Sequence, residues 1–252
     1  MKVAVITGAS SGIGEACAEA FAQAGWALAL GARREARLVE LAPKLRQLGS
    51  PEVMTTALDV TDEASVEAFA QKVEGRFAGI DVLVNNAGLA AGLDPVVDGK
   101  DSDWRAMLET NVYGLLRTTR RFLPRMIKQG KGHIVNMGSI AGFQTYANGA
   151  VYAGTKHAVK AITGALRLEL NGTPLRVSEI DPGAVETEFS IVRLKDQTKA
   201  DAVYQGMTPL TGKDIADCVL FVVTRPAHVN IDHIVIMPTD QASVYKTHRR
   251  PS

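Results

Sequence analysis

The sequence has few cysteines and no excess of charge, and each of these features excludes a class of protein. The 252 residues include only two cysteines, Cys17 and Cys218, and both lie on apolar faces of expected helices. We therefore expect buried thiols, with neither a disulfide framework nor a bound metal. The 28 lysines and arginines balance 27 acidic residues, so no net field favours nucleic acid or an anionic membrane as a partner.

Long apolar runs are also lacking. No run approaches the ~18 residues of a membrane-spanning helix. The first expected strand begins at residue 2 or 3, which leaves no room for a signal peptide, and we therefore expect a cytoplasmic protein. The single basic cluster, residues 248–250, is expected to be a solvated tail.

Helical and strand patterns alternate along the whole chain, with no linker, repeat or low-complexity run. This favours one domain over residues 1–252 rather than two small ones, and a hydrophobic fraction of 46% is ample for its core. Strands such as Val82-Leu83-Val84 are apolar on successive residues, which favours a doubly wound α/β fold with a parallel sheet covered on both faces. We expect strands near 3–7, 26–32, 53–58, 80–85, 132–138, 175–181 and 233–237, and helices near 12–24, 35–48, 62–76, 102–129 (with 112–114 as the candidate for a break), 150–171 and 212–224.

A glycine-rich turn, Thr7–Gly14, lies between the first strand and the first helix. Such a turn lets the backbone approach a pyrophosphate, whose charge the helix N-terminus favours. The spacing here is G-x-x-x-G-x-G rather than the usual G-x-G-x-x-G. A tight strand-to-helix connection without a ligand is the alternative.

Tyr152 and Lys156 lie four residues apart in an expected helix, thirteen residues after Ser139. Positions i and i+4 share one helix face, so the phenol and the ammonium point the same way. A free tyrosine has a pKa near ~10, and a neighbouring cation lowers that pKa toward the range useful for acid–base catalysis. Ser139 could then polarise the oxygen of a carbonyl or an alcohol. The alternative is an ordinary amphipathic helix turn.

Taken together, these motifs resemble the short-chain dehydrogenase/reductase family, from Val3 to about Pro238. The resemblance rests on Thr7–Gly14, Asn85-Asn86-Ala87-Gly88, Asn111, Ser139, Tyr152-x-x-x-Lys156 and Pro182-Gly183. It implies a Rossmann-type fold with a seven-stranded parallel sheet flanked by helices. It also implies four catalytic roles: Tyr152 as the acid–base residue, Ser139 orienting the substrate oxygen, Lys156 lowering the tyrosine pKa and binding the nicotinamide ribose, and Asn111 disturbing its helix and holding a relay water.

The end of the second strand indicates NADP(H) rather than NAD as the cofactor. Relatives that use NAD carry an acidic residue there, whereas this chain has Ala32 followed by Arg33 and Arg34. Two guanidinium groups suit a 2′-phosphate, although a pair of solvated arginines is the alternative. The resemblance assigns further cofactor contacts to Gly8, Ser10, Ser11, Gly12, Ile13, Gly14, Asp59, Val60, Asn86, Ala87, Gly88, Tyr152, Lys156, Pro182, Gly183, Val185 and Thr187.

The substrate is expected to be a small molecule covered by a mobile segment, residues 186–206. This segment and residues 226–231 and 237–240 resemble NADP-dependent 3-hydroxy acid dehydrogenases, which act on serine, allo-threonine and the matching semialdehydes. Ser139 and Tyr152 would then contact the substrate, and Arg193 becomes a candidate clamp for its carboxylate, with a solvent-exposed loop arginine as the alternative. Gln144, Tyr146 and Asn148 are further candidates for the pocket wall.

Two other functions remain open at this point. One is a broad-specificity NADPH-dependent ketone or aldehyde reductase, and the other is a non-catalytic protein that binds NADPH to sense redox state. The family resemblance also implies a homo-oligomer, a homotetramer in most relatives.

Overall fold

The computed structural model describes residues 1–251 and contains one seven-stranded parallel sheet. The strands are ordered β3-β2-β1-β4-β5-β6-β7, which confirms the predicted doubly wound sheet. All registers are parallel, as in Val5 opposite Ala29 of β2 and Leu83 of β4. The strands are β1 (Val3–Thr7), β2 (Ala27–Ala32), β3 (Val53–Ala57), β4 (Val82–Asn85), β5 (Gly132–Met137), β6 (Leu175–Pro182) and β7 (His233–Ile236).

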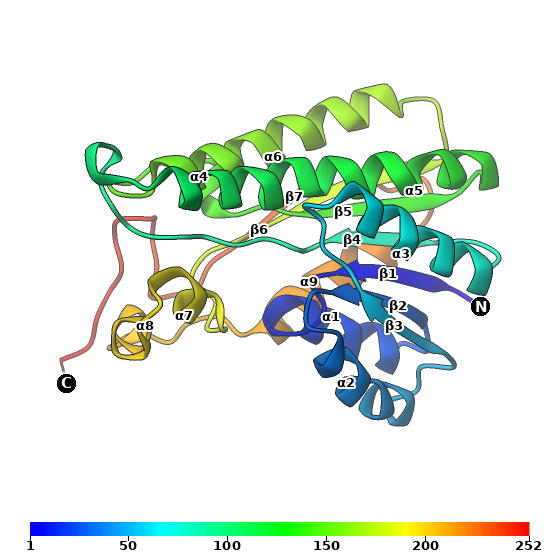
Figure 1. Cartoon of the computed structure of the whole chain (residues 1–252), viewed down its shortest axis with the longest axis horizontal. Coiled ribbons are helices and arrows are strands. Elements are labelled where there is room, and N and C mark those ends of the chain that lie inside the picture. Colours follow the sequence, from blue (N-terminus) through cyan, green and yellow to red (C-terminus); the bar gives the residue numbers. More distant parts are fainter. Residues whose placement is uncertain (252) are drawn as a thin grey trace.

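Helices cover both faces of the sheet and enclose two apolar cores (Figure 1). The apolar side chains of the central strands point alternately to the two faces, so each face needs a helical layer. One layer consists of α1 (Gly12–Gln23), α2 (Glu35–Gln47) and α9 (Gly212–Val223); the other consists of α3 (Glu63–Arg76), α4 (Asp101–Leu108), α5 (Leu115–Gln129) and α6 (Ala150–Glu169).

The strand order reverses between β1 and β4. The chain proceeds from β1 outward to β3 and then returns to the other side of β1 with β4. Loops that leave neighbouring strands in opposite directions open a crevice beyond the carboxyl ends, which is where doubly wound sheets bind ligands. The short helices α7 (Phe189–Leu194) and α8 (Gln197–Tyr204) lie beyond this end of the sheet (Figure 1).

The single helix expected over 102–129 is divided by a π-helical turn, Glu109–Gly114, between α4 and α5. The break therefore begins three residues earlier than the predicted position. The segment 186–206, expected only as a mobile loop, contains α7 and α8. Short 3₁₀ turns at Val96–Asp98 and Ile140–Gly142 were not predicted.

Two further expectations were partly wrong. Cys17 is buried, but Cys218 is only half-buried, because its side of α9 is not fully covered. The tail is exposed yet bound to the molecule. Arg249 donates a hydrogen bond to the carbonyl of Val203 at 3.0 Å, and Arg250 forms an ion pair with Asp240 at 2.9 Å.

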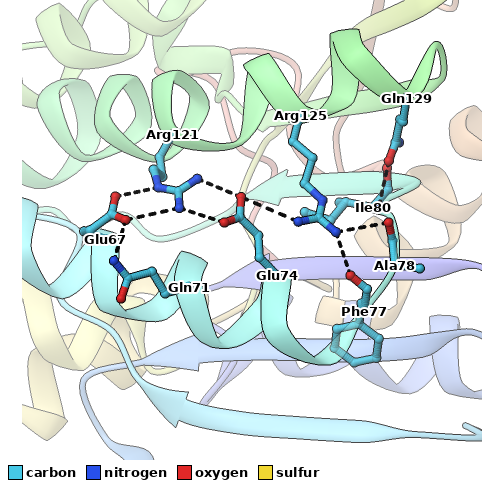
Figure 2. A network of polar contacts seen from close by, with 9 residues as sticks. All are labelled: Glu67, Gln71, Glu74, Phe77, Ala78, Ile80, Arg121, Arg125 and Gln129. Atoms are coloured by element: carbon cyan, nitrogen blue, oxygen red, sulfur yellow. Dashed lines mark hydrogen bonds and ion pairs between the residues drawn. The ribbon is translucent and has the colours of Figure 1, made fainter.

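Helices α3 and α5 are joined by a polar network that Figure 2 shows from close by. Arg121 of α5 bridges Glu67 and Glu74 of α3 at 2.6 and 2.8 Å. One turn later, Arg125 donates hydrogen bonds to the carbonyls of Phe77 and Ala78 at 2.8 and 3.0 Å. The network thus fixes the C-terminal end of α3 against the middle of α5.

Within residues 1–251, no helix combines the length and apolar character needed to cross a membrane.

Candidate active site

A cavity of about 770 Å³ opens beyond the carboxyl ends of the strands, at the reversal between β1 and β4. It brings together most of the predicted residues. Gly14 and Asn111 do not line it: they lie behind its wall and support the residues that do. The predicted residues in the wall are Gly8, Ser10, Ser11, Gly12, Ile13, Arg33, Arg34, Asp59, Val60, Asn86, Ala87, Gly88, Ser139, Tyr152, Lys156, Pro182, Gly183, Val185, Thr187 and Arg193.

The glycine-rich turn forms the floor of one end of the cavity. Gly8 has φ +68°, and a side chain at Gly14 would lie 2.4 Å from the Gly8 carbonyl, so these two positions require glycine. Asn86 donates hydrogen bonds to the carbonyls of Thr7 and Gly8 at 2.9 and 3.1 Å. Ser11, the N-cap of α1, makes no side-chain cap, which leaves the first-turn amides available to an anion.

Arg34 lies across this end of the cavity. Its guanidinium donates hydrogen bonds to the hydroxyls of Ser10 and Ser11, at 3.4 and 2.6 Å. It also pairs with Glu188, which precedes α7, at 2.8 Å. Arg33 lies beside it in the cavity wall. The Arg34 guanidinium thus lies beside hydroxyl groups and helix amides, with Arg33 in the same wall.

Tyr152 and Ser139 lie at the other end of the cavity. Burial raises the pKa of Tyr152 to about 12, only partly offset by a hydrogen bond with Ser139 and by the charge of Arg193. The charge of Lys156 is not among the causes of this shift, and its role in lowering the Tyr152 pKa stays a prediction. The Lys156 ammonium lies 5.9 Å from the ring centroid of Tyr152 and is directed to the Met137 carbonyl, 2.8 Å away. Burial lowers the pKa of Lys156 to about 8.

Asn111 lies within the π-helical turn and is buried. Its amide oxygen accepts from the Leu89 N–H and its amide nitrogen donates to the Leu89 carbonyl, both at 2.8 Å. The same nitrogen donates to the Thr155 hydroxyl at 3.1 Å. Asn111 thereby fixes the loop after β4 to α6, at Thr155, the residue that precedes Lys156.

A buried carboxyl pair behind Ser139 was missed in the sequence. Glu179 and Asp181 lie on the same face of β6, both fully buried. Asp181 accepts a hydrogen bond from the Ser139 N–H at 3.1 Å and contacts His233 Nδ1 at 3.2 Å. Burial raises the pKa of both carboxyls, and their charge raises the pKa of Lys156. Two acids spaced by two, and therefore on one face of an expected strand, were the available signal.

The substrate end is covered by α7. The Arg193 guanidinium lies 5.5 Å from the ring centroids of both Tyr152 and Tyr146, and its Nε donates to the Gly92 carbonyl at 3.1 Å. The Phe189 ring lies edge-on to Tyr152, with centroids 5.7 Å apart. Arg193 is therefore a cavity residue, and the solvent-exposed alternative is wrong.

The chain's C-terminal segment supplies two cavity residues that the sequence did not predict, Gln241 and Val244. Gln241 accepts a hydrogen bond from the Ala184 N–H at 2.8 Å. Of the three further candidates, Tyr146 lines the cavity and Asn148 lines a small neighbouring pocket. Gln144 lines neither and instead accepts from the Val244 N–H at 3.0 Å. No local sequence pattern links positions about a hundred residues apart.

Comparison with known proteins gives consistent matches over almost the whole chain. Residues 2–198 match the family model for short chain dehydrogenases. Sulfoacetaldehyde reductase 2 of Chromohalobacter salexigens is 44% identical over 95% of each chain. NADP-dependent 3-hydroxy acid dehydrogenase of Schizosaccharomyces pombe is 43% identical over 99% of this chain and 97% of its own. The structure of serine dehydrogenase in its closed form with NADP⁺ superimposes with a TM-score of 0.91 at 40% identity, covering 99% of this chain and 100% of that one.

Proposed function

The chain belongs to the short-chain dehydrogenase family, and on that premise we propose that it is an NADP-dependent oxidoreductase of short 3-hydroxy acids and the matching semialdehydes. It interconverts a hydroxyl and a carbonyl group. The observation that carries the proposal is a single cavity with Arg34 and the helix amides at one end and Tyr152 and Arg193 at the other.

The residues present fit NADP(H). The cavity is large enough for a dinucleotide, the glycine-rich turn offers amides to the pyrophosphate, and Arg33 and Arg34 offer two cations to a 2′-phosphate. When bound, the nicotinamide supplies the hydride chemistry. Cofactor contacts along the rest of the wall, from Asp59 and Val60 to Thr187, are part of the same proposal.

The protein manages the proton and the position of the substrate. Tyr152 takes the hydroxyl proton during oxidation and returns it during reduction, and Ser139 holds the reacting oxygen. Because burial favours the neutral phenol, Tyr152 needs added positive charge to act as a base. Lys156 is the cation placed to supply it, and we propose that it also binds the nicotinamide ribose. Asn111 positions the loop and helix around this group.

Arg193 is the proposed partner of the substrate's anionic group. Its guanidinium lies beside the Tyr152 ring, so a short substrate could reach both. Malonic semialdehyde and sulfoacetaldehyde each carry their anion one methylene from the carbonyl carbon. The similarity to a sulfoacetaldehyde reductase therefore favours a second candidate with the same chemistry, reduction of a short sulfonate aldehyde.

The experiment that tests the proposal is an initial-rate panel. L-Serine, L-allo-threonine and 3-hydroxyisobutyrate are oxidised at mildly alkaline pH with NADP and NAD in parallel. Malonic semialdehyde, sulfoacetaldehyde and simple ketones are reduced with NADPH. We expect NADP-dependent rates on the acids, and an Arg193→Met variant should raise KM for anionic substrates about tenfold or more while sparing neutral ketones.

Other outcomes separate the alternatives. Rates on neutral ketones and aldehydes alone would support a broad-specificity reductase and contradict the Arg193 clamp. A preference for sulfoacetaldehyde would support the second candidate. Tight NADPH binding without turnover on any substrate would support the redox-sensing alternative.

We also propose a cytoplasmic homotetramer. Exposed apolar side chains on α4, α5 and α6, including Leu116, Ile127 and Leu168, offer area for subunit contacts. Light scattering after size-exclusion chromatography should give about four times the 26.9 kDa chain mass. A monomer would contradict the proposal.

A further inference from the structure

Glu188 pairs with Arg34, one of the two arginines proposed to bind the cofactor's 2′-phosphate. Its two carboxylate oxygens pair with different arginines: Oε2 with Arg34 at 2.8 Å and Oε1 with Arg37 of α2 at 2.6 Å. Glu188 thus spans from the segment that covers the substrate to the segment that follows β2. Both arginines hold the pKa of this carboxyl below its ordinary value, so it is an anion at neutral pH.

The segment that carries Glu188 also reaches the catalytic end. Phe189, the next residue, packs edge-on against the Tyr152 ring, and Arg193 lies one turn later beside the same ring. Ser190 is hydrogen-bonded to the Tyr204 hydroxyl at 2.7 Å, which joins α7 to α8. A change in the ion pairs of Glu188 therefore affects α7, the helix that covers Tyr152.

From this geometry we propose that Glu188 is a cofactor-specificity residue that competes with the 2′-phosphate for Arg34. The contacts of Glu188 with Arg34 and Arg37 are called the Glu188 latch below. A 2′-phosphate takes Arg34 and leaves Glu188 on Arg37 alone, which loosens α7. A cofactor without this phosphate leaves the latch closed. The inference rests on the proposed NADP site and adds a link between that site and the substrate segment.

The strength of the latch sets the size of the effect. Both arginines and Glu188 are between a third and a half exposed, so each ion pair is weak and is screened by salt. The 2′-phosphate breaks only the Arg34 pair, and one such exposed pair favours the closed latch by a factor of about one and a half to five. This is a modest cost for a dianionic phosphate that makes stronger, bidentate contacts to arginine.

The first test compares two isosteric variants, Glu188→Gln and Glu186→Gln. Glu186 is exposed, lies two residues away and carries the same charge, but it makes none of the ion pairs found among residues 1–251. Fluorescence titration should show Glu188→Gln lowering the Kd for NADPH about two- to fivefold with the Kd for NADH unchanged. Glu186→Gln should leave both values as in the parent protein. If both variants lowered the Kd for NADPH equally, the loss of one negative charge near the site would explain the effect, and the latch proposal would be overturned.

The second test measures the substrate segment directly with cofactor fragments that lack the nicotinamide. Hydrogen exchange of residues 188–194 is followed with saturating 2′,5′-ADP or 5′-AMP. We expect faster exchange with 2′,5′-ADP only, and fast exchange in Glu188→Gln with or without either fragment. The same response to both fragments would contradict the proposal.

A third variant separates failure of the latch from failure of the NADP site. Replacing both Arg33 and Arg34 with Ala should weaken NADPH binding far more than NADH binding. Equal losses would refute the 2′-phosphate site and the latch with it. A selective loss, together with unchanged cofactor affinity in Glu188→Gln, would overturn the latch alone.

Discussion

At the scale of single residues, the charges around Tyr152 explain why it needs a cationic partner. Burial raises the pKa of the phenol to about 12 and lowers the pKa of Lys156 to about 8. Each group is thus shifted toward its neutral form, and the carboxyls of Glu179 and Asp181 keep Lys156 charged against this trend. The proposed catalytic group is therefore a set of four mutually dependent titratable side chains rather than a tyrosine–lysine pair.

Replacing Tyr152 by Phe should remove the proton donor while keeping the ring in contact with Phe189. We expect turnover to fall by at least about a hundredfold, the contribution typical of a positioned acid or base. NADPH affinity should change little. Steady-state kinetics and a fluorescence titration measure the two effects separately. Normal turnover in this variant would contradict the catalytic assignment.

Local motifs made much of this site predictable at the residue scale. The glycine-rich turn, Tyr152 with Lys156, and the two arginines after β2 each depend on positions a few residues apart, so spacing alone brings them together. Glu188, Gln241 and the carboxyl pair of β6 were not predicted. Their roles depend on contacts across 57 to 154 positions or on burial, neither of which has a periodic signal.

At the scale of elements, the junction between α3 and α5 depends on one partly buried charge. The side chain of Arg121 is 25% exposed and contacts both Glu67 and Glu74 (Figure 2). The neighbouring Arg120 pairs with Glu63, but these two side chains are 72% and 73% exposed. The two arginines differ mainly in how far water screens their ion pairs.

Arg121→Met should destabilise the protein by about 1 kcal/mol, because it removes the main cation beside the partly buried carboxylate of Glu74. Arg120→Met should cost less than about 0.5 kcal/mol. Urea denaturation of both variants, with equal m-values, measures the difference. Similar losses for the two would show that the network of Figure 2 adds nothing beyond a surface ion pair.

Element boundaries were predicted correctly where they follow the spacing of apolar residues in the sequence. They were missed where contacts between distant segments determine them. The strands and long helices agree within a few residues. The π-helical turn begins earlier than expected, and within it the Asn111 side chain bonds to Leu89 in the loop after β4, a contact that no hydrophobic period reveals. Helices α7 and α8 are short, and contacts such as Ser190 with Tyr204 stabilise them more than any sequence period could.

At the scale of the whole molecule, the buried carboxyl pair makes stability depend on pH. Because burial raises the pKa of Glu179 and Asp181 in the folded state, the folded protein retains protons that the unfolded chain has lost. Their contribution is fully present below the ordinary carboxyl pKa of ~4 and is lost as pH rises toward neutrality. His133 acts oppositely: burial lowers its pKa to about 3, so stability is lost as pH falls below ~6.5.

Glu179→Gln should therefore change the pH dependence of stability without changing the fold. The amide has the carboxyl's shape but does not ionise. Relative to the parent protein, the variant should gain stability as pH rises from about 4.5 to 7, by roughly 1–3 kcal/mol. Chemical denaturation across this range gives the difference, in which the contribution of His133 cancels. A constant difference between the two proteins would contradict the raised pKa.

The separation between the two ends of the cavity has a consequence for the direction of catalysis. Arg34 and Ser11 lie at the end proposed for the 2′-phosphate, whereas Tyr152 lies at the end proposed for the nicotinamide, where the oxidised and reduced cofactors differ. The oxidised and reduced cofactors carry the same 2′-phosphate, so the arginines select the coenzyme pool without sensing its redox state. Net flux then follows the mass-action ratio of that pool. In a cell that keeps its NADP pool reduced, we therefore expect the enzyme to run mainly in the direction of carbonyl reduction.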